Sequence, residues 1–416
     1  MALSLATVAV ACGSTEPTPP PKTSSPTPTA AVVSTGMPTS TTELTPAPTG
    51  TATASLPTPP TSPTAAQGVA LDAKTAAALQ ATLQSLRDRG NFPGISAAVV
   101  FPDGAMWTGQ AGVGVLSTKA ELTPDTLFSV GSITKTFTGA LALRLAERGT
   151  ISLDDRLSKW VPTYPNAANI TLRELLNHTS GIRDFFETAT FKYIDADHNA
   201  TWTPEQVLAR IGKPYFAPGK GYHYSSTNYV LLGLVLERAT GKQLAELVRT
   251  EFLDPLGLSH TFLQSEEPIT GTLAHGYLGP PTSPKDVSVG QAMLPYVSVA
   301  TASGASGALV STPSDIAKWA TALYGGELLD HASMAAMLDV STSAPYHPEI
   351  QYGLAVERLP VGGRLGWGHR GHLDGFWSTM VYLPASHLTF VVLVSADWPD
   401  PLKTVGAMVT AVLGPA

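Results

Sequence analysis

Short apolar runs near both ends of the chain predict the strands of one sheet. At the amino end, a helical pattern over residues 72–89 is followed by an apolar run over residues 95–101, the turn 102–104 and a second strand that begins at Ala105. At the carboxyl end, apolar runs and a final helical pattern lie at residues 352–359, 365–369, 376–383, 388–395 and 402–412. The long segment between the two groups is mainly helical in pattern. We therefore expect an α/β fold of the α+β type, in which an antiparallel sheet built from both chain ends is flanked by helices and carries an inserted, mostly helical region.

Capping residues mark helix starts within the inserted region. Thr171 with Glu174, and Thr203 with Gln206, have the spacing of capping boxes. A Thr-Pro pair begins, and a glycine ends, a further predicted helix over residues 312–325. We expect a cleft where the helical region meets the sheet.

Composition separates the first 66 residues from the rest. Residues 1–12 are apolar and uncharged and end in a small residue before Cys12, which predicts a lipoprotein-type export signal whose cysteine becomes lipidated. The alternative is a frayed apolar end with an incidental thiol. Residues 13–66 contain 13 Pro, 16 Thr and 7 Ser and no aromatic residue, so we expect a disordered tether before a folded domain at residues 67–416. These features predict a secreted or cell-surface protein, anchored by lipid to the outer face of a bacterial membrane.

Charge and cysteine content exclude several classes of function. The chain has 25 Lys and Arg against 32 Asp and Glu, which argues against nucleic-acid binding because that needs a basic surface. Beyond the first dozen residues no apolar run approaches the roughly 20 residues that span a bilayer, so we expect membrane contact only through the N-terminal anchor. The single cysteine excludes an internal disulfide and a cysteine-based metal site, and we expect no cofactor.

The strongest chemical signal is the S-x-x-K sequence formed by Ser132 and Lys135. It begins a helix whose buried stripe is marked by apolar residues at every fourth position, Ile133, Phe137, Leu141 and Leu145. A spacing of three places the serine and the lysine on one helix face, where a neutral amine can accept the serine proton. The lysine pKa must then fall from about 10.4 toward neutrality, a shift that burial can cause. Alone, the tetrapeptide also fits a capping serine followed by an exposed lysine.

A second polar cluster, residues 222–228, precedes an apolar helix over residues 229–236. The Tyr224 phenol, if it lies beside a lysine, can be driven toward phenolate and can shuttle the serine proton, because each charged form stabilises the other. The alternative is a capping hydroxyl with two aromatic rings that pack a loop.

The third cluster, residues 366–372, lies at the end of one predicted strand and before the next. Glycines at a strand edge, Gly371 among them, allow a substrate backbone to approach closely, and an extended peptide could add to this edge. His369, His372 and Asp374 could also be considered as metal ligands. Strand side chains three positions apart point to opposite faces, so we do not expect a metal site.

In order and spacing, the three clusters resemble the serine penicillin-recognising hydrolases, whose pattern is S-x-x-K, then Y-x-N, then K/H-x-G. These include class C β-lactamases, serine D-alanyl-D-alanine carboxypeptidases and esterases related to class C β-lactamases. The resemblance implies a β-lactamase/transpeptidase-like fold. It runs from about residue 70 to residue 414 and includes the segments 128–135, 175–181, 224–226, 255–257 and 368–371.

The resemblance implies a role for each matching residue. Ser132 is the acylated nucleophile, Lys135 is its activating base, and Tyr224 is the proton relay that also serves deacylation. His369 takes the cationic or hydrogen-bonding place of the third motif. The backbone N–H groups of Ser132 and His372 would form the oxyanion hole.

Two positions depart from the family pattern. Ser226 replaces an asparagine, so an amide able to bind both the lysine and the substrate carbonyl is missing. Arg370 occupies the middle of the third motif, where Thr or Ser is common. Its guanidinium could bind a substrate carboxylate or point to solvent.

The expected function is that of an exported serine hydrolase acting through an acyl-enzyme on Ser132, most simply a D-alanyl-D-alanine carboxypeptidase on cell-wall peptides. A β-lactamase or a small-ester esterase stays open, because residue types do not fix the deacylation geometry. The expected partner is thus a small peptide, β-lactam or ester. A catalytically weak penicillin-binding or sensor module is the alternative from another class, and Ser226 is its main support.

Other polar features receive no catalytic role. Residues 304–308 resemble a nucleophile elbow, but they end in alanine and lack a βαβ pattern, so we expect a loop. We expect His178 to be structural, and the acidic pairs 154–155 and 266–267 to be solvated.

Overall fold

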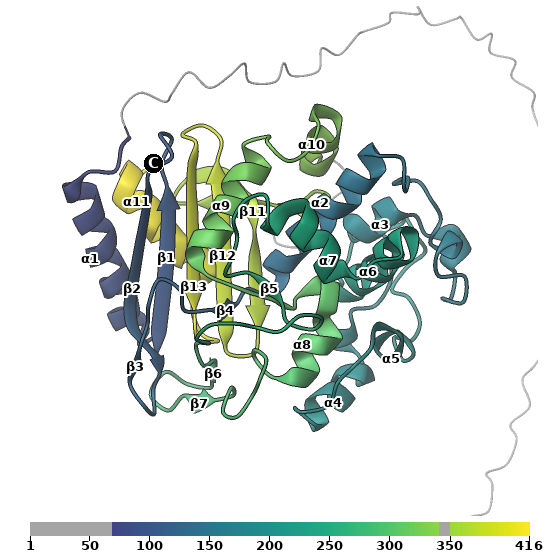
Figure 1. The fold of residues 1–416 in the computed structure, drawn as a ribbon, viewed down its shortest axis with the longest axis horizontal. Helices are drawn as coiled ribbons and strands as arrows, with labels where there is room; N and C mark the ends of the chain where they lie inside the picture. Colours follow the sequence, from purple (N-terminus) through teal and green to yellow (C-terminus); the bar gives the residue numbers. More distant parts are fainter. Residues whose placement is uncertain (1–68, 341–349) are drawn as a thin grey trace, which may run out of the picture. The chain divides into compact units, whose positions relative to one another are not determined.

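The computed structural model describes residues 69–340 and 350–416. The predicted signal, its cysteine and the whole predicted tether lie outside these residues. In the described part of the chain, the largest sheet has eight antiparallel strands in the order β3-β2-β1-β13-β12-β11-β10-β9 (Figure 1). In that order the strands span Ala120–Glu121, Met106–Val115, Gly94–Val100, Leu388–Val394, Phe376–Leu383, Arg364–Leu373, Glu357–Val361 and Gln351–Tyr352. The predicted sheet built from both chain ends is confirmed.

Strands from the two ends of the domain, β1 and β13, pair inside this sheet. Ile95 lies opposite Val394, and Val100 lies opposite Thr389. Every residue of both strands is buried. A strand that is covered on both faces favours apolar residues on both, which explains why these segments are mainly apolar without alternation, with Ser96 and Thr389 as buried polar exceptions.

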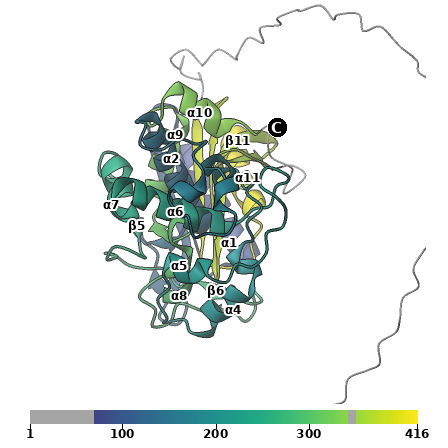
Figure 2. The same cartoon turned by 90° about the vertical axis from the view of Figure 1, so that its right-hand side faces the viewer.

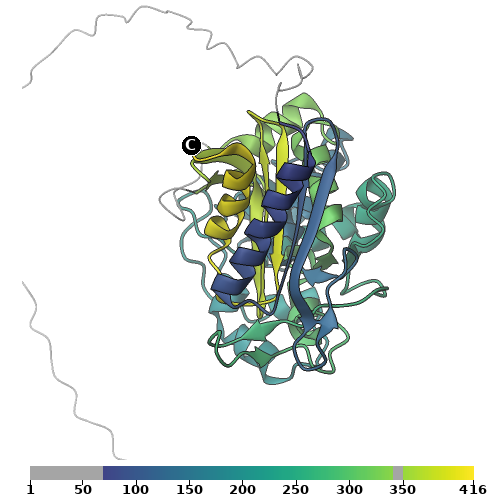
Figure 3. The same cartoon turned by 90° about the vertical axis from the view of Figure 1, so that its left-hand side faces the viewer.

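Helices cover both faces of the sheet. On one face, α1 (Ala73–Gly90) and α11 (Pro401–Leu413) pack side by side (Figure 3). On the other face, α9 (Pro313–Tyr324) packs against β1, β12 and β13. Alternate residues of β1 therefore belong to two apolar clusters, with Val99 beside α1 and α11 and Ala98 on the side of α9.

The inserted region packs on the α9 side of the sheet (Figures 1 and 2). Its other helices are α2 (Thr134–Glu147), α3 (Leu172–Leu176), α4 (Ala189–Ala196), α5 (Pro204–Leu208), α6 (Ser226–Thr240), α7 (Leu244–Val248), α8 (Val297–Ser303) and α10 (His331–Leu338). Both predicted capping boxes form, at Thr171 and at Thr203. Over residues 69–340 and 350–416, every helix falls short of the length and apolarity needed to cross a membrane.

Two strand boundaries differ from the prediction. The strand expected over residues 352–359 is interrupted between β9 and β10, where Ala355 has a left-handed conformation with φ 62°. Strand β11 continues to Leu373, so the third polar cluster lies within a strand and not after its end. Apolar patterning cannot detect this extension, because residues 366–372 are mostly glycine and polar residues, while backbone pairing with β12 continues through Leu373.

A smaller sheet connects the nucleophile segment to the inserted region. Its strands β4 (Phe128–Ser129), β8 (Leu309–Ser311) and β5 (Phe262–Leu263) are arranged in the order β4-β8-β5. Strand β4 leads into the turn that carries Ser132, and β8 follows the turn that ends at Ser306. The sheet therefore fixes two segments that meet in the site described below.

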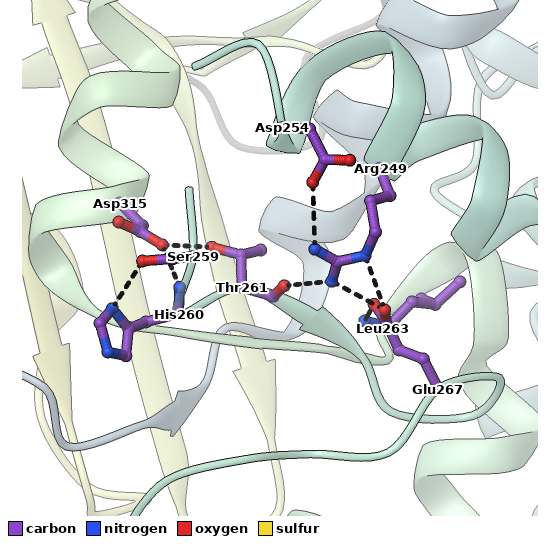
Figure 4. Close-up of polar contacts among 8 residues, drawn as sticks. All are labelled: Arg249, Asp254, Ser259, His260, Thr261, Leu263, Glu267 and Asp315. Carbon is purple, nitrogen blue, oxygen red and sulfur yellow. Dashed lines mark hydrogen bonds and ion pairs between the residues drawn. The ribbon is translucent and has the colours of Figure 1, made fainter. Parts of the chain in front are cut away.

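A polar cluster anchors β5 at the edge of this smaller sheet (Figure 4). Arg249 donates hydrogen bonds to Glu267 at 2.7 and 3.0 Å and to the Thr261 carbonyl oxygen at 3.2 Å. Glu267 also accepts the Leu263 N–H at 2.7 Å, and Asp315 on α9 accepts the Thr261 hydroxyl at 3.1 Å. The expectation that Glu267 is solvated is wrong, because its side chain is only 15% exposed and holds an ion pair.

Candidate active site

Ser132 lies on a short 3₁₀ turn between β4 and α2. The turn begins with Gly131 at φ 49°, a conformation that glycine adopts without steric cost. A Cβ atom on Gly131 would lie 2.8 Å from the His372 nitrogen, and one on Gly371 would lie 2.0 Å from the Val130 carbonyl oxygen. Two glycines thus allow the edge of β11 to pass beside the nucleophile turn.

The Lys135 amine has three oxygen partners. Its Nζ lies 2.9 Å from Ser132 Oγ, 3.3 Å from Ser226 Oγ and 2.8 Å from the Ser306 carbonyl oxygen. A neutral amine has two protons and one lone pair. If the two protons go to Ser306 and Ser226, the lone pair remains for the Ser132 hydroxyl, as a general base requires.

Burial lowers the pKa of Lys135 to about 7, although the charges of Asp184 and Glu357 act in the opposite direction. The lysine is completely buried in the first turn of α2. This is the fall toward neutrality that the role of general base requires, and burial is its cause. Near neutral pH a substantial fraction of the amine can accept a proton.

Tyr224 lies beside both the nucleophile and the lysine. Its phenol hydrogen-bonds with the Ser132 side chain, and the Lys135 Nζ lies 5.0 Å from the centre of its ring. Burial raises the pKa of Tyr224 well above its usual value, although the bond to Ser132 lowers it. The expectation that the phenol is driven toward phenolate is therefore not met, because desolvation favours the neutral form. Tyr224 can still relay a proton, because a neutral hydroxyl both donates and accepts.

The His178 ring packs against the Tyr224 ring. The two ring centres are 4.3 Å apart, and the Nδ1 atom of His178 accepts the Ser225 N–H at 3.1 Å. Burial, followed by the charge of Lys135, holds the pKa of His178 well below its usual value. A neutral, buried ring that orients Tyr224 agrees with the structural role expected for this residue.

His369 is a neutral hydrogen-bonding residue of the third motif and not a cation. Burial lowers its pKa to about 4. Its Nδ1 lies 2.5 Å from the Arg370 carbonyl oxygen, which can only accept, so Nδ1 carries the proton. Its Nε2 then accepts the Tyr352 hydroxyl at 3.0 Å. Both ring nitrogens are therefore engaged within the protein.

The Arg370 guanidinium is bound by Glu357 of the neighbouring strand β10. Its Nε and Nη2 atoms donate to the two carboxylate oxygens at 3.0 and 2.8 Å, and the Arg370 N–H donates to the same carboxylate at 2.9 Å. Burial alone would raise the pKa of Glu357, but the charge of Arg370 and its hydrogen bonds lower it to about 2. Arg370 thus neither points freely to solvent nor offers these two nitrogens to a substrate carboxylate.

The His372 N–H faces the same edge of β11 as the Arg370 N–H. Alternate backbone N–H groups of a strand point to the same side, and that of Arg370 points away from β12, toward Glu357. Pairing with β10 ends at Gly368, so this edge is not covered by β10 beside His372. A donor here, close to the Ser132 turn, has the position that an oxyanion hole requires.

These groups line a cavity of about 430 Å³. The size suits a small molecule or a short peptide. All of the predicted substrate-contacting residues meet there, together with carboxyl groups that the sequence did not identify. The lining residues are Ser132, Asp184, Phe186, Glu187, Phe191, Tyr224, Ser226, Glu357, His369, Arg370, Gly371, His372, Leu373, Asp374 and Trp377.

Three groups that act on the lysine were not predicted from the sequence. Asp184 accepts the Ser226 N–H at 3.1 Å and raises the Lys135 pKa through its charge, as Glu357 also does. The Ser306 carbonyl, from the segment assigned to a loop, is the third group. A backbone carbonyl has no sequence signature. The two carboxylates come from distant segments, so no local spacing could have indicated them.

Comparison with known proteins identifies the family. The family model described as Beta-lactamase matches residues 79–413, which is most of the chain. The chain belongs to the β-lactamase family. It is 26% identical over 337 residues to penicillin-binding protein 4* of Bacillus subtilis, covering 77% of this chain and 72% of that protein. It is 30% identical over 253 residues to the teichoic acid D-alanine hydrolase of Staphylococcus aureus, covering 60% of this chain but only 59% of that relative.

Solved structures give the same result for this β-lactamase-family chain. A D-stereospecific amidohydrolase from Streptomyces sp. superimposes with a TM-score of 0.70 and 29% identity over 82% of this chain and 99% of that chain. The D-amino acid amidase from Ochrobactrum anthropi SV3, complexed with L-phenylalanine amide, superimposes with a TM-score of 0.71 and 26% sequence identity. This match covers 81% of this chain and 98% of that chain. The predicted fold and family are confirmed, and the protein is a serine hydrolase of this family.

The arrangement supports acyl transfer through Ser132. In this geometry the hydroxyl oxygen can attack a carbonyl carbon while its proton moves to the neutral Lys135 amine. The Ser132 and His372 N–H groups are placed to stabilise the negative oxygen that would form. The leaving nitrogen or oxygen can take the proton held by Lys135, through Tyr224, as its bond to the carbonyl carbon breaks. Water can then attack the ester carbon and give a proton to Lys135 through Tyr224, and Lys135 can return that proton to Ser132 as the acid is released.

Proposed function

We propose that this protein hydrolyses amide or ester bonds formed by the carboxyl group of a D-amino acid whose amino group is free. The observation that carries the proposal is the ion pair between Arg370 and Glu357. A carboxypeptidase must bind the terminal carboxylate of its substrate, and Arg370 was the candidate that the sequence offered for this contact, with exposure to solvent as the alternative. Its binding to Glu357 favours a substrate that presents an ammonium group to the site.

The charge of the cavity wall supports the same substrate class. Asp184, Glu187, Glu357 and Asp374 all line the cavity, whereas Arg370 is the only Lys or Arg among its described lining residues. Since Arg370 compensates Glu357, the remaining carboxyl groups favour a cation over an anion.

The names of the relatives agree with this choice. Two solved neighbours are a D-stereospecific amidohydrolase and a D-amino acid amidase, and one relative in sequence is named a teichoic acid D-alanine hydrolase. All three names refer to a D-configured amino acid or to D-stereospecificity. The carboxypeptidase, β-lactamase and esterase activities become the competing outcomes of the test.

The test is a hydrolysis panel with purified protein. It contains D-alanine p-nitroanilide, the L-enantiomer, a peptide ending in D-Ala-D-Ala, nitrocefin and a p-nitrophenyl ester of an achiral acid. We expect the highest kcat/KM for D-alanine p-nitroanilide and no turnover by the Ser132→Ala variant, with the melting temperature within a few degrees of the parent. A clear preference for the D-Ala-D-Ala peptide or nitrocefin would overturn the proposal.

We also propose that the enzyme is exported and lipid-anchored through Cys12, as the composition of residues 1–66 indicates. Expression in a bacterial host should give a protein that partitions into detergent. A Cys12→Ser variant should move to the aqueous phase, and equal partitioning of both forms would contradict lipidation.

A further inference from the structure

The Asp374 carboxylate lines the cavity and has fewer hydrogen-bond donors around it than its two oxygens can accept. With Gly375 it forms the turn between β11 and β12. Its Oδ2 accepts the Tyr296 hydroxyl at 2.5 Å, but the same hydroxyl lies 3.0 Å from Asp195 Oδ1. A phenol has one proton, so it can donate to only one of the two carboxylates at a time.

The two carboxylates differ in their other surroundings. Asp195 has a largely exposed side chain, and the His198 ring lies 3.3 Å from it. Asp374 is mostly buried, and no Lys, Arg or His among residues 69–340 and 350–416 lies within 4.0 Å of its oxygens. Burial raises its pKa, although the Tyr296 hydroxyl and the charge of His372 lower it. A cation beside Asp374 would therefore be favourable.

The other carboxyl groups of the cavity have their acceptor sites filled to a greater extent. Glu357 accepts three hydrogen bonds from Arg370. Asp184 accepts the N–H groups of Ser226 and Phe186, both at 3.1 Å. Glu187 is half exposed, accepts the hydroxyl of Tyr215 and lies 3.6 Å from the Nε2 atom of His223. Of the four, Asp374 is the one whose only hydrogen-bond donor among the described residues is shared with another carboxylate.

We propose that Asp374 is the specificity-determining residue that binds the α-ammonium group of the substrate. The inference rests on the proposed function and assigns its amino-group subsite. The α-nitrogen is two bonds from the carbonyl carbon that Ser132 attacks, so it must lie within a few ångströms of the oxyanion position. The His372 N–H faces that position, and Asp374 lies two residues further along the same hairpin.

The turn that carries Asp374 is held rigidly. Gly375 has φ 79°, and a Cβ atom there would lie 2.5 Å from the Tyr277 nitrogen, so the turn packs directly on that backbone. Tyr296 is buried, and its ring stacks on His198 at 3.7 Å. A carboxylate held on both sides can bind an ammonium group without a large loss of conformational freedom.

A pair of substrates that differ only in charge tests this assignment. D-alanine p-nitroanilide has the ammonium group, and N-acetyl-D-alanine p-nitroanilide lacks it. We expect the parent enzyme to prefer the first. In Asp374→Asn, kcat/KM for the free amine should fall about ten-fold or more, as expected for loss of one partner of a desolvated charge pair, while the N-acetyl substrate changes little. Equal losses on both substrates, or none, would overturn the role of Asp374.

Tyr296→Phe separates charge from structural support. This variant loses the phenol hydroxyl but keeps the Asp374 carboxylate, so its preference for the free amine should persist. If the preference is lost as completely as in Asp374→Asn, the hydroxyl and not the charge determines specificity. The parent enzyme also tests the proposed function, because a preference for the N-acetyl substrate contradicts the requirement for a free amino group and overturns the role of Asp374 with it. A free-amine preference that is unchanged in Asp374→Asn overturns the role of Asp374 alone and leaves the proposed function standing. Turnover of neither substrate, with Ser132 still labelled by a fluorophosphonate, overturns the proposed function and the inference with it.

Discussion

The rate at which Ser132 is acylated should follow the deprotonation of Lys135. The lysine has a pKa of about 7, because it is completely buried. For a single group of this pKa, the neutral fraction is about 0.1 at pH 6, about 0.5 at pH 7 and about 0.9 at pH 8. The acylation rate should therefore rise about five-fold between pH 6 and pH 7, and about two-fold between pH 7 and pH 8.

Labelling with a limiting fluorophosphonate probe measures this step without deacylation. The observed rate of Ser132 modification is followed from pH 5.5 to pH 9, with the melting temperature recorded at each pH to exclude unfolding. A rate that does not change between pH 6 and pH 8, or that rises only near pH 10, would refute the assignment of Lys135 as a neutral base.

Removing the negative charge of Asp184, near Lys135, should shift the pH at which the acylation rate is half of its maximum. Because the Asp184 carboxylate raises the Lys135 pKa, Asp184→Asn should move the midpoint of the rate profile to lower pH. The amide oxygen can still accept the Ser226 N–H that Asp184 binds at 3.1 Å, but the amide nitrogen cannot accept the Phe186 N–H that binds the second oxygen, so the melting temperature of this variant is measured as well. Asp154→Asn, at a side chain that is 78% exposed, is the matched control and should leave the midpoint unchanged. A midpoint that rises in Asp184→Asn would contradict the electrostatic reasoning.

Three further variants test the packing and the chemistry of the site. Gly371→Ala places a Cβ atom 2.0 Å from the Val130 carbonyl oxygen and 2.2 Å from Ser378 Oγ. We therefore expect a loss of about 1–3 kcal/mol in unfolding free energy and a sharply reduced acylation rate. A melting curve and a rate like those of the parent would show that the strand edge can move. Ser226→Asn restores the family residue beside Lys135, and we expect faster acylation by peptide-like substrates; a slower rate would show that the hydroxyl is an adapted feature of this site. Lys135→Met should be inactive but more stable to urea at pH 6 than the parent. The folded-state pKa of about 7 lies below the ordinary lysine value of 10.5, so the parent gains stability as pH rises from about 7 to 10.5, and the advantage of the variant should shrink over that range.

Sequence patterns predicted those parts of the site that depend on short-range spacing. Ser132 and Lys135 lie one helical turn apart, so their proximity follows from helix geometry alone. The Thr171 capping box and the hairpin of β1 and β2 are local in the same sense, and both form. The position of Tyr224 beside them depended on the family resemblance, since no local rule joins residues so far apart in the chain.

The polar environment of the lysine could not be predicted in this way. Ser306 acts through a backbone carbonyl, and its side-chain identity gave no indication of that role. Glu357 belongs to a strand whose start was misplaced, because the left-handed residue Ala355 interrupts an otherwise apolar run. Its pairing with Arg370 depends on the register of β10 against β11, in which Glu357 lies opposite Gly368. Strand register over this hairpin is a tertiary property that neither apolar runs nor motif spacing determine.

Arg370, the arginine of the third motif, affects the pKa of Lys135 through Glu357. Glu357 is ionised, with a pKa of about 2, and its charge raises the Lys135 pKa. Without a cation beside it, this buried carboxylate would act more strongly on the amine and would favour its protonated, inactive form. Arg370 binds both oxygens of Glu357 and thereby weakens that effect. A threonine or serine at position 370 could not compensate the charge, so an arginine here is required by the glutamate on the neighbouring strand and not by a carboxylate on the substrate.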